Sequence, residues 1–311
     1  MYKYVIKRLI WIIPIILGVT FIVFSIISLT PGDPARLILG SSATEEAVTA
    51  LRVNMGLEKP MIIRYFDYLM KAITGDFGKS YLTGQPVMND IFKSWPITIT
   101  IAFYSTILGS LLAIPLGIFA ALRHRGAFDI ISTVVSMIIV ATPTAAISII
   151  LLLVFSLYLK VLPASGIESW KNYVMPVSVL LSFVLTSLMR LVRTTMLDTI
   201  KQDYITTIRA KGAPERVVVL RHAFKNVSLM VVTQIGMTFS SMLAGAVLVE
   251  QIFGMPGLGS LVLKSIRAKD IPSIMGTTIV LSLVVVFTVL ILDIVYAYID
   301  PRIRAKYAGG K

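Results

Sequence analysis

Stretches without a single charged residue recur along this chain and divide it into six apolar windows. Each window holds at least 18 residues, and a helix needs about 20 mostly apolar residues to cross roughly 30 Å of hydrocarbon. The windows are Leu9–Gly32, Ser94–Leu122, Ile130–Leu159, Asn172–Met189, Asn226–Val249 and Ile271–Leu292. The pattern therefore predicts an all-α polytopic membrane protein with six transmembrane helices.

Two of the windows have features that shape the expected helices. The fourth window is the shortest, and Leu191 and Val192 can extend it if Arg190 and Arg193 snorkel to the interface. In the third window, Thr142-Pro143-Thr144 predicts a bend, because neighbouring helices of a bundle can satisfy the backbone groups that a proline frees.

Composition supports the membrane interpretation. Of the 311 residues, 56% are hydrophobic and only 14% are charged, with a mean hydropathy of +0.86. A soluble domain is nearer a quarter charged and could not keep so much apolar surface from water. The chain has no cysteine, which excludes a disulfide framework and a thiolate metal site.

Lysine and arginine gather on one side of the windows, which predicts how the chain is oriented. The opposite short loops hold only Lys160, Lys171, Lys264, Arg267 and Lys269. We expect the basic side to be cytoplasmic, with both termini inside, so that the net charge of +13 reports topology and not nucleic-acid binding. We also expect the first window to be an uncleaved anchor, because it is longer than the apolar region of a signal peptide.

The polar segment Asp33–Lys93 lies on the predicted outer side and carries seven acidic and seven basic residues. Within Met61–Met70, apolar residues recur at helical spacing. We expect a small, partly helical extracellular segment, which could receive a partner protein or be simply a packed loop. The predicted organisation is an anchor with this segment (1–93), a core of five spans (94–301) and a cytoplasmic tail (302–311).

The loop between the fourth and fifth windows, residues 198–226, has the pattern of a helical hairpin. Asp203 is the expected N-cap of a short helix through Lys211. Gly212 suits the left-handed position that ends a helix, and Pro214 with Glu215 suits the first turn of the next helix. A flexible loop would satisfy the charge asymmetry equally well. A rigid hairpin could instead be held by a soluble partner and act as a lever on the helices that it joins.

Several residues of this loop form a recognisable motif. They are Asp203, Tyr204, Arg209, Ala210, Lys211, Gly212, Arg221, His222, Ala223 and Asn226. This motif resembles the ATPase-coupling loop of ATP-binding-cassette importer permeases, and most closely that of the dipeptide/oligopeptide/nickel branch. The resemblance implies that these residues dock in a cleft of the ATPase and move with it.

Other segments similar to that branch follow in order along nearly the whole chain. They are Pro31-Gly32-Asp33-Pro34, Gly56-Leu57, Lys59-Pro60, Gly75-Asp76-Phe77-Gly78, Ser80-Tyr81, Leu162-Pro163, Ser165-Gly166, Glu250, Ile252-Phe253, Pro256-Gly257-Leu258-Gly259 and Asp300-Pro301-Arg302. Two positions depart from the family pattern. Ile208 replaces the usual alanine, which we expect to alter the packing of the coupling helix. Ser228-Leu229-Met230 lacks the usual proline, which we expect to smooth the entry into the fifth helix.

The resemblance implies a type I importer in the bacterial or archaeal cytoplasmic membrane. A homologous second permease would complete the path as a heterodimer, two cytoplasmic ATPase subunits would bind and hydrolyse ATP with Mg²⁺, and an external binding protein would deliver the solute. The chain has no Gly-x-x-x-x-Gly-Lys-Ser/Thr phosphate loop. We therefore expect a non-catalytic subunit without a bound cofactor.

Other classes of membrane protein fit less well. An ion-coupled secondary transporter usually has an ionisable residue mid-membrane, and none lies at the centre of a window. A channel would leave the hairpin unexplained. An intramembrane enzyme would need a paired nucleophile and base, whereas the two histidines, His124 and His222, both lie in cytoplasmic loops.

The substrate is less well defined by the sequence. The windows hold no cluster of His, Cys or carboxylate groups for nickel, although a metal can pass as a chelate, so we favour short peptides and keep nickel chelates as the alternative. Candidate residues along the path are Thr142, Pro143, Thr144, Met237 and Met242. Ordinary helix packing would explain the bend and the spacing of the methionines equally well.

Overall fold

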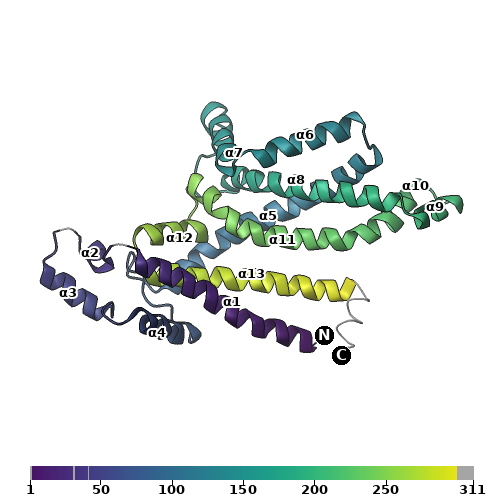
Figure 1. Ribbon diagram of the computed structural model, residues 1–311. Coiled ribbons are helices and arrows are strands. Elements are labelled where there is room, and N and C mark those ends of the chain that lie inside the picture. Colours follow the sequence, from purple (N-terminus) through teal and green to yellow (C-terminus); the bar gives the residue numbers. More distant parts are fainter. Residues whose placement is uncertain (1, 31, 41, 300–311) are drawn as a thin grey trace. The chain divides into compact units, whose positions relative to one another are not determined.

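The structure is a computed structural model that describes residues 2–30, 32–40 and 42–299, so the predicted tail 302–311 lies outside the described residues. Within these ranges the regular structure is helical, and the only bridge is an isolated one between Lys79 and Pro86 (Figure 1). The helices are α1 (Tyr2–Leu29), α2 (Pro34–Leu39), α3 (Glu45–Asn54), α4 (Met61–Ile73), α5 (Val87–Leu122), α6 (Ala127–Ala141), α7 (Thr144–Leu151), η1 (Leu152–Tyr158), α8 (Lys171–Ile200), α9 (Asp203–Ala210), α10 (Glu215–Val217), η2 (Val218–Ala223), α11 (Phe224–Ile252), α12 (Leu258–Arg267) and α13 (Ile271–Ile299). The predicted all-α class is confirmed.

Five helical stretches in the described part of the chain are long and apolar enough to cross a membrane. They are Ile10–Leu29, Val87–Leu122, Lys171–Ile200, Glu215–Ile252 and Ile271–Ile291. Each contains or overlaps one of the predicted windows. The second stretch begins before the window that predicted it, because charged residues end an apolar window but do not end a helix.

The third window is broken in two, as Thr142-Pro143-Thr144 predicted. Helices α6 and α7–η1 pass the test for a span only together, and they meet at an angle of 102°. The Thr142 N–H still bonds to the Ile138 carbonyl (3.0 Å), but Pro143 has no N–H to continue the ladder. The pair makes a sixth span if it counts as one bent span.

The described chain folds into two compact units. The N-terminal unit comprises Tyr2–Thr98 with Pro256–Val286, and the hairpin unit comprises Ile99–Met255 with the last part of α13 from Phe287 onward. Helices α5 and α13 each contribute to both units. The predicted division at residues 93 and 94 remains a prediction.

In the hairpin unit, glycines allow α5 and α8 to pack closely. A Cβ atom at Gly109 would lie 2.7 Å from Val184 Cβ, and one at Gly117 would lie 2.8 Å from the Met189 carbonyl oxygen. Small residues commonly allow helices to approach in this way in membranes. Helices α6 and α11 also pack against α8, which therefore forms the centre of this unit (Figure 1).

In the N-terminal unit, the segment between α1 and α5 is partly helical, as predicted, and α4 packs against α1. The buried Tyr65 hydroxyl donates to the Leu17 carbonyl (2.8 Å) and lies 2.9 Å from the Thr20 hydroxyl. Its ring meets Phe21 edge-on, with 5.2 Å between centroids. The helical spacing within Met61–Met70 thus correctly predicted α4, but it did not indicate that α4 would pack against α1.

A buried carboxylate ties the turn before α5 to the start of α13 within the same unit. Asp270 accepts hydrogen bonds from the Ser80 hydroxyl (2.5 Å) and the Ser273 hydroxyl (2.8 Å). The Asp270 side chain also accepts from the Ser273 backbone N–H (3.3 Å) in the first turn of α13. Because a buried charge is costly unless it is hydrogen-bonded, these bonds hold the turn and the helix together.

Candidate functional site

The predicted helical hairpin is present, with two corrections at its helix ends. Helix α9 begins with Asp203 itself, and Gln202 occupies the N-cap position without a side-chain cap bond. The predicted N-cap at Asp203 is therefore wrong by one residue, although its charge still lies in the first turn, where the helix dipole favours it. Pro214 precedes α10 and does not belong to its first turn, because the helical conformation starts at Glu215.

The turn of the hairpin depends on Gly212. Its φ is +79°, and a Cβ atom built there would meet no atom within 4 Å. The requirement for glycine therefore comes from the left-handed backbone alone, since residues with a Cβ rarely adopt it. The Gly212 N–H donates to the Arg209 carbonyl (2.9 Å), so the turn closes directly on α9.

An ion pair braces this turn from the outside. Arg209 Nε donates to one Glu215 carboxylate oxygen (3.0 Å) and Nη2 to the other (2.6 Å). The fork geometry joins α9 to α10 across the glycine. Both side chains are substantially exposed, so the pair contributes at most about 1 kcal/mol to stability. Its main effect is to orient the two helices.

A second contact joins α9 to the start of α11. Asn226 Nδ2 donates to the Tyr204 hydroxyl at 2.5 Å. Both residues belong to the motif in the sequence, but their 22-residue separation gave no indication that they touch. The hairpin is therefore closed at its base by this bond and at its tip by the ion pair.

Removing the hydroxyl of Tyr204 tests the base of the hairpin. We expect Tyr204→Phe to lower stability by about 0.5–1 kcal/mol, the net value of one hydrogen bond. Asn226→Ala should cost a similar amount, and the double variant should cost little more than either change alone. Thermal unfolding followed by tryptophan fluorescence measures this, with Tyr158→Phe at an exposed tyrosine as the matched control. Fully additive losses would show that the two side chains do not interact.

The underside of the hairpin packs into an apolar core. Ile205 of α9 is fully buried with Met196, Val218 and Val219, and Ile208 packs against the same cluster. The isoleucine that departs from the family pattern therefore adds apolar contact beneath α9. The helix runs on without a break from η2 into α11, in line with the missing proline near Ser228.

The outer face of the hairpin is polar and mostly basic. His222 is half-buried, whereas the other residues of the motif named above, apart from the buried Ala223, are exposed. In Figure 1, α9 and α10 lie at one end of α8 and α11, away from α7. The hairpin therefore presents a rigid, charged surface at the end of two long helices. The described residues include no group of three or more His, Cys, Asp or Glu that could hold a metal ion.

A buried ion pair that the sequence analysis missed fastens α8 to the start of α6. Asp129, whose side chain is 3% exposed, pairs with Arg193, and Arg193 Nη2 donates to Asp129 Oδ2 at 2.8 Å. The Arg125 N–H (2.9 Å) and the His124 ring (3.2 Å to Nδ1) contact the same carboxylate. Arg193 thus pairs with Asp129, and does not serve only to extend the span by snorkelling.

The candidate path residues lie in two separate places. Thr142, Pro143 and Thr144 form the break between α6 and α7, where the Thr142 hydroxyl donates to the Ile138 carbonyl (2.7 Å). Met237 and Met242 lie on α11, and Met237 is 58% exposed. Their role in a path remains a prediction.

A mostly apolar cavity of about 520 Å³ in the hairpin unit was not indicated by any motif. Side chains of α5, α11 and the last part of α13 line it, including Phe103, Ile235 and Phe239. Two hydroxyls of its lining, Thr106 Oγ1 and Ser110 Oγ, are buried and have no hydrogen-bond partner in the part of the chain that the structure describes. Such a surface suits an apolar occupant, and helix periodicity alone could not show that three distant helices meet there.

Comparison with known proteins agrees with this geometry. Residues 113–305 match the family described as binding-protein-dependent transport system inner membrane component, and residues 1–102 match the N-terminal region of such membrane components. The chain belongs to this family, and it is a multi-pass inner-membrane permease subunit of an ATP-binding-cassette importer.

Particular relatives refine the class. The glutathione transport system permease protein GsiC of Escherichia coli (strain K12) is 35% identical over 306 residues, covering 98% of this chain and 100% of the relative. The protein of that name from Salmonella typhimurium strain LT2 has the same identity and coverage. A solved structure of the MetNI methionine ABC transporter, in an inward-facing conformation, matches with a TM-score of 0.58 at 16% identity, covering 68% of this chain and 97% of that one. This last likeness supports the type I importer permease fold.

Proposed function

We propose that this chain is the permease half of an importer for short peptides, driven by ATPase subunits that grip the hairpin at residues 198–226. The observation that carries the proposal is the hairpin itself: its apolar underside is buried at Ile205, its turn requires Gly212, and its outer face is exposed. A loop that served only to link two spans would need none of these features.

The hairpin suits the transmission of a mechanical stroke. Helix α8 leads into α9, and α10–η2 continues into α11, so a force on α9 reaches both long helices. The ion pair from Arg209 to Glu215 and the bond from Asn226 to Tyr204 resist bending of the hairpin. Movement of the ATPase would therefore shift α8 and α11 as stiff levers, with ATP and Mg²⁺ bound on the ATPase and not on this chain.

The remaining partners follow from the same proposal. A homologous second permease would complete the path as a heterodimer, and an external binding protein would deliver the solute. The bias of lysine and arginine toward one side supports cytoplasmic termini in a bacterial or archaeal membrane. The bent pair α6–α7 and the apolar cavity beside Phe103 are the surfaces that we assign to the path or to the second permease.

The proposed substrate class is a short peptide. The relatives are named as permeases of a glutathione transport system, and glutathione is a small peptide-like solute. The similarity of the relatives to this chain extends over 98% of its length. A nickel chelate is the alternative. Uptake of a radiolabelled tripeptide and of a nickel–histidine chelate by the same reconstituted importer would separate the two, and saturable uptake of the chelate alone would reject the peptide assignment.

The energy source is tested with the complete importer in proteoliposomes. Uptake should require ATP inside the vesicle, on the side of the ATPases, and should persist when ionophores collapse the proton and sodium gradients. Vesicles that lack the ATPase subunits are the matched control. Uptake that follows an ion gradient and ignores ATP would show that the chain is a secondary transporter, and the proposal would then fail.

A further inference from the structure

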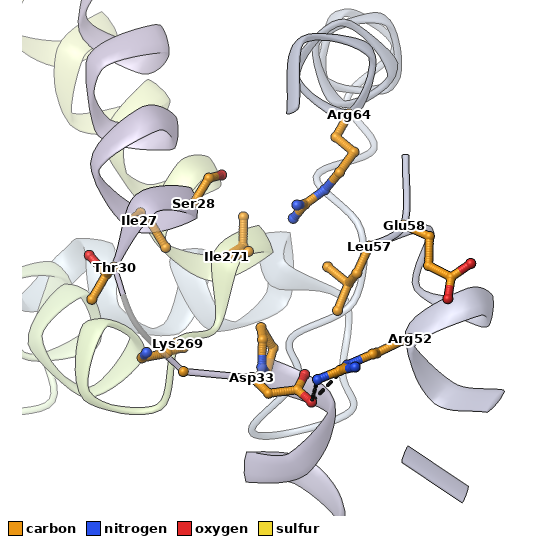
Figure 2. Close-up of a pocket in the computed structure, with 12 residues that line it drawn as sticks. Ile27, Ser28, Thr30, Asp33, Arg52, Leu57, Glu58, Arg64, Lys269 and Ile271 are labelled. Atoms are coloured by element: carbon orange, nitrogen blue, oxygen red, sulfur yellow. Dashed lines mark hydrogen bonds and ion pairs between the residues drawn. The ribbon is translucent and has the colours of Figure 1, made fainter. Parts of the chain in front are cut away.

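A cavity of about 560 Å³ lies within the N-terminal unit (Figure 2). The end of α1, the stretch that joins α3 to α4 and the turn between α12 and α13 surround it. Cavities of several hundred Å³ are the size that holds small molecules. Three basic residues from distant parts of the sequence line it, namely Arg52, Arg64 and Lys269, together with the acidic Asp33 and Glu58.

One of these basic residues already has a counter-ion. Arg52 Nε donates to Asp33 Oδ2 at 2.8 Å, and Nη2 lies 2.7 Å from the same oxygen (Figure 2). Burial raises the pKa of Asp33, but hydrogen bonds from Arg52 and from the Ala35 N–H outweigh it and hold this pKa below its usual value. Asp33 is therefore ionised at neutral pH, and its negative charge is already paired with Arg52.

Two other polar groups of the lining have no such partner. The Lys269 Nζ atom is buried and has no hydrogen-bond partner among the described residues, and the same holds for the Ser28 hydroxyl. The Arg64 guanidinium points into the space between Leu57 and Ile271 in Figure 2, and it forms no ion pair with the residues that the structure describes. A buried donor without an acceptor costs free energy, so an acceptor placed beside Lys269 Nζ and the Ser28 hydroxyl would be bound favourably.

The backbone holds Lys269 in this place at a cost. Its φ is +52°, a left-handed conformation that glycine usually supplies at the end of a helix. The lysine amine rests against Gly32, where an added Cβ would lie only 2.0 Å from Nζ. A side chain at position 32 would displace the amine, and a glycine at position 269 would relieve the backbone. The chain therefore has a strained lysine where an unstrained residue would suffice for the turn.

We propose that this cavity binds the carboxylate group of the transported solute, with Lys269 as its principal partner and Ser28 and Arg64 as further donors. A carboxylate accepts hydrogen bonds and donates none, so it satisfies the two unpartnered donors and adds the missing negative charge. A short peptide carries such a group at its C-terminus and fits the volume. This inference rests on the proposed function for the nature of the solute, but not for the existence of the anion site.

The test compares two forms of one peptide on the permease–ATPase complex in nanodiscs, without nucleotide and without the external binding protein. Radiolabelled trialanine with a free C-terminus should bind at least tenfold more tightly than trialanine amide. Lys269→Met should abolish this preference, whereas the matched control Lys264→Met, at an exposed lysine of α12, should keep it. Gly32→Ala should also abolish the preference without changing any charge, because the added Cβ displaces the amine and the φ of +126° at Gly32 disfavours a residue with a Cβ.

Lys269→Gly separates loss of binding from loss of folding. This variant should unfold at the same or a higher temperature than the parent, since it removes the left-handed lysine, and it should still show no preference for the free acid. Equal binding of acid and amide by the parent complex would overturn the inference, as would displacement of the peptide by inorganic phosphate at lower concentration than by acetate, which would indicate a phosphate or lipid-headgroup site.

An acidic side chain of the binding protein could also supply the carboxylate. If Lys269→Met weakens the binding of the external binding protein but leaves the binding of trialanine unchanged, the assignment to the solute is overturned. ATP-driven uptake by the parent importer is scored separately in proteoliposomes. A normal uptake result together with equal binding of the two peptide forms would therefore reject this site and leave the proposed function standing.

Discussion

Replacing Gly212 with valine should abolish ATP-driven uptake while the protein still inserts into the membrane. Gly212 has a φ of +79°, and a left-handed conformation costs an L-residue about 1–2 kcal/mol, and more with a β-branch. Since about 1.4 kcal/mol is a factor of ten in an equilibrium constant, the equilibrium constant for forming the native turn should fall at least tenfold. The transport rate in proteoliposomes should fall with it.

A second substitution at position 212 serves as the control, because a side chain there meets little steric hindrance. A Cβ at Gly212 would meet no described atom within 4 Å, so the backbone conformation is the main property under test. Gly212→Asn, which adopts the left-handed region far more readily, should keep most of the uptake. ATPase subunits should either dissociate from the valine variant or hydrolyse ATP without transport. Unchanged uptake by the valine variant would show that this turn does not transmit the stroke.

Replacing Arg193 with methionine should strongly destabilise the protein. It would leave the Asp129 carboxylate, 3% exposed, without its principal partner. Breaking a buried pair in this way costs about 3–5 kcal/mol, and we expect about 2–4 kcal/mol here because Arg193 remains 23% exposed. The unfolding temperature in detergent, followed by tryptophan fluorescence, should fall by several degrees or more.

Two further variants identify the cause of that loss. Asp129→Asn combined with Arg193→Met should recover part of the stability, because the uncompensated charge is then gone. Arg190→Met, on the same helix but at an exposed position, should have almost no effect. An equal loss for Arg190→Met and Arg193→Met would show that the pair contributes nothing beyond a general effect of positive charge on this helix.

The spans illustrate what periodicity can and cannot predict. A membrane helix must form its own backbone hydrogen bonds and keep charges away from the centre of the hydrocarbon, and both requirements are visible in a linear sequence. The windows and the break at Pro143 could therefore be predicted. The 102° angle at that break could not, because a proline stops the hydrogen-bond ladder without setting the direction of the next helix.

The hairpin shows the same division at the level of side chains. Gly212, Pro214 and Glu215 predicted a turn between two helices, since each acts through local backbone chemistry. The start of α9 was misplaced by one residue, because Gln202 and Asp203 can both stand before a helix. The bond from Asn226 to Tyr204 joins residues 22 positions apart, and nothing local predicts such a pair.

The sequence alone determined the all-α membrane class, the positions of the spans and the presence of the hairpin, because these depend on local backbone bonding and on the solvent that each segment tolerates. Only the tertiary structure decided which distant groups meet: Arg193 with Asp129, Lys269 with Gly32, and the glycines of α5 with α8. Such contacts depend on how whole helices pack, and packing is a property of three-dimensional shape that no window of neighbouring residues contains.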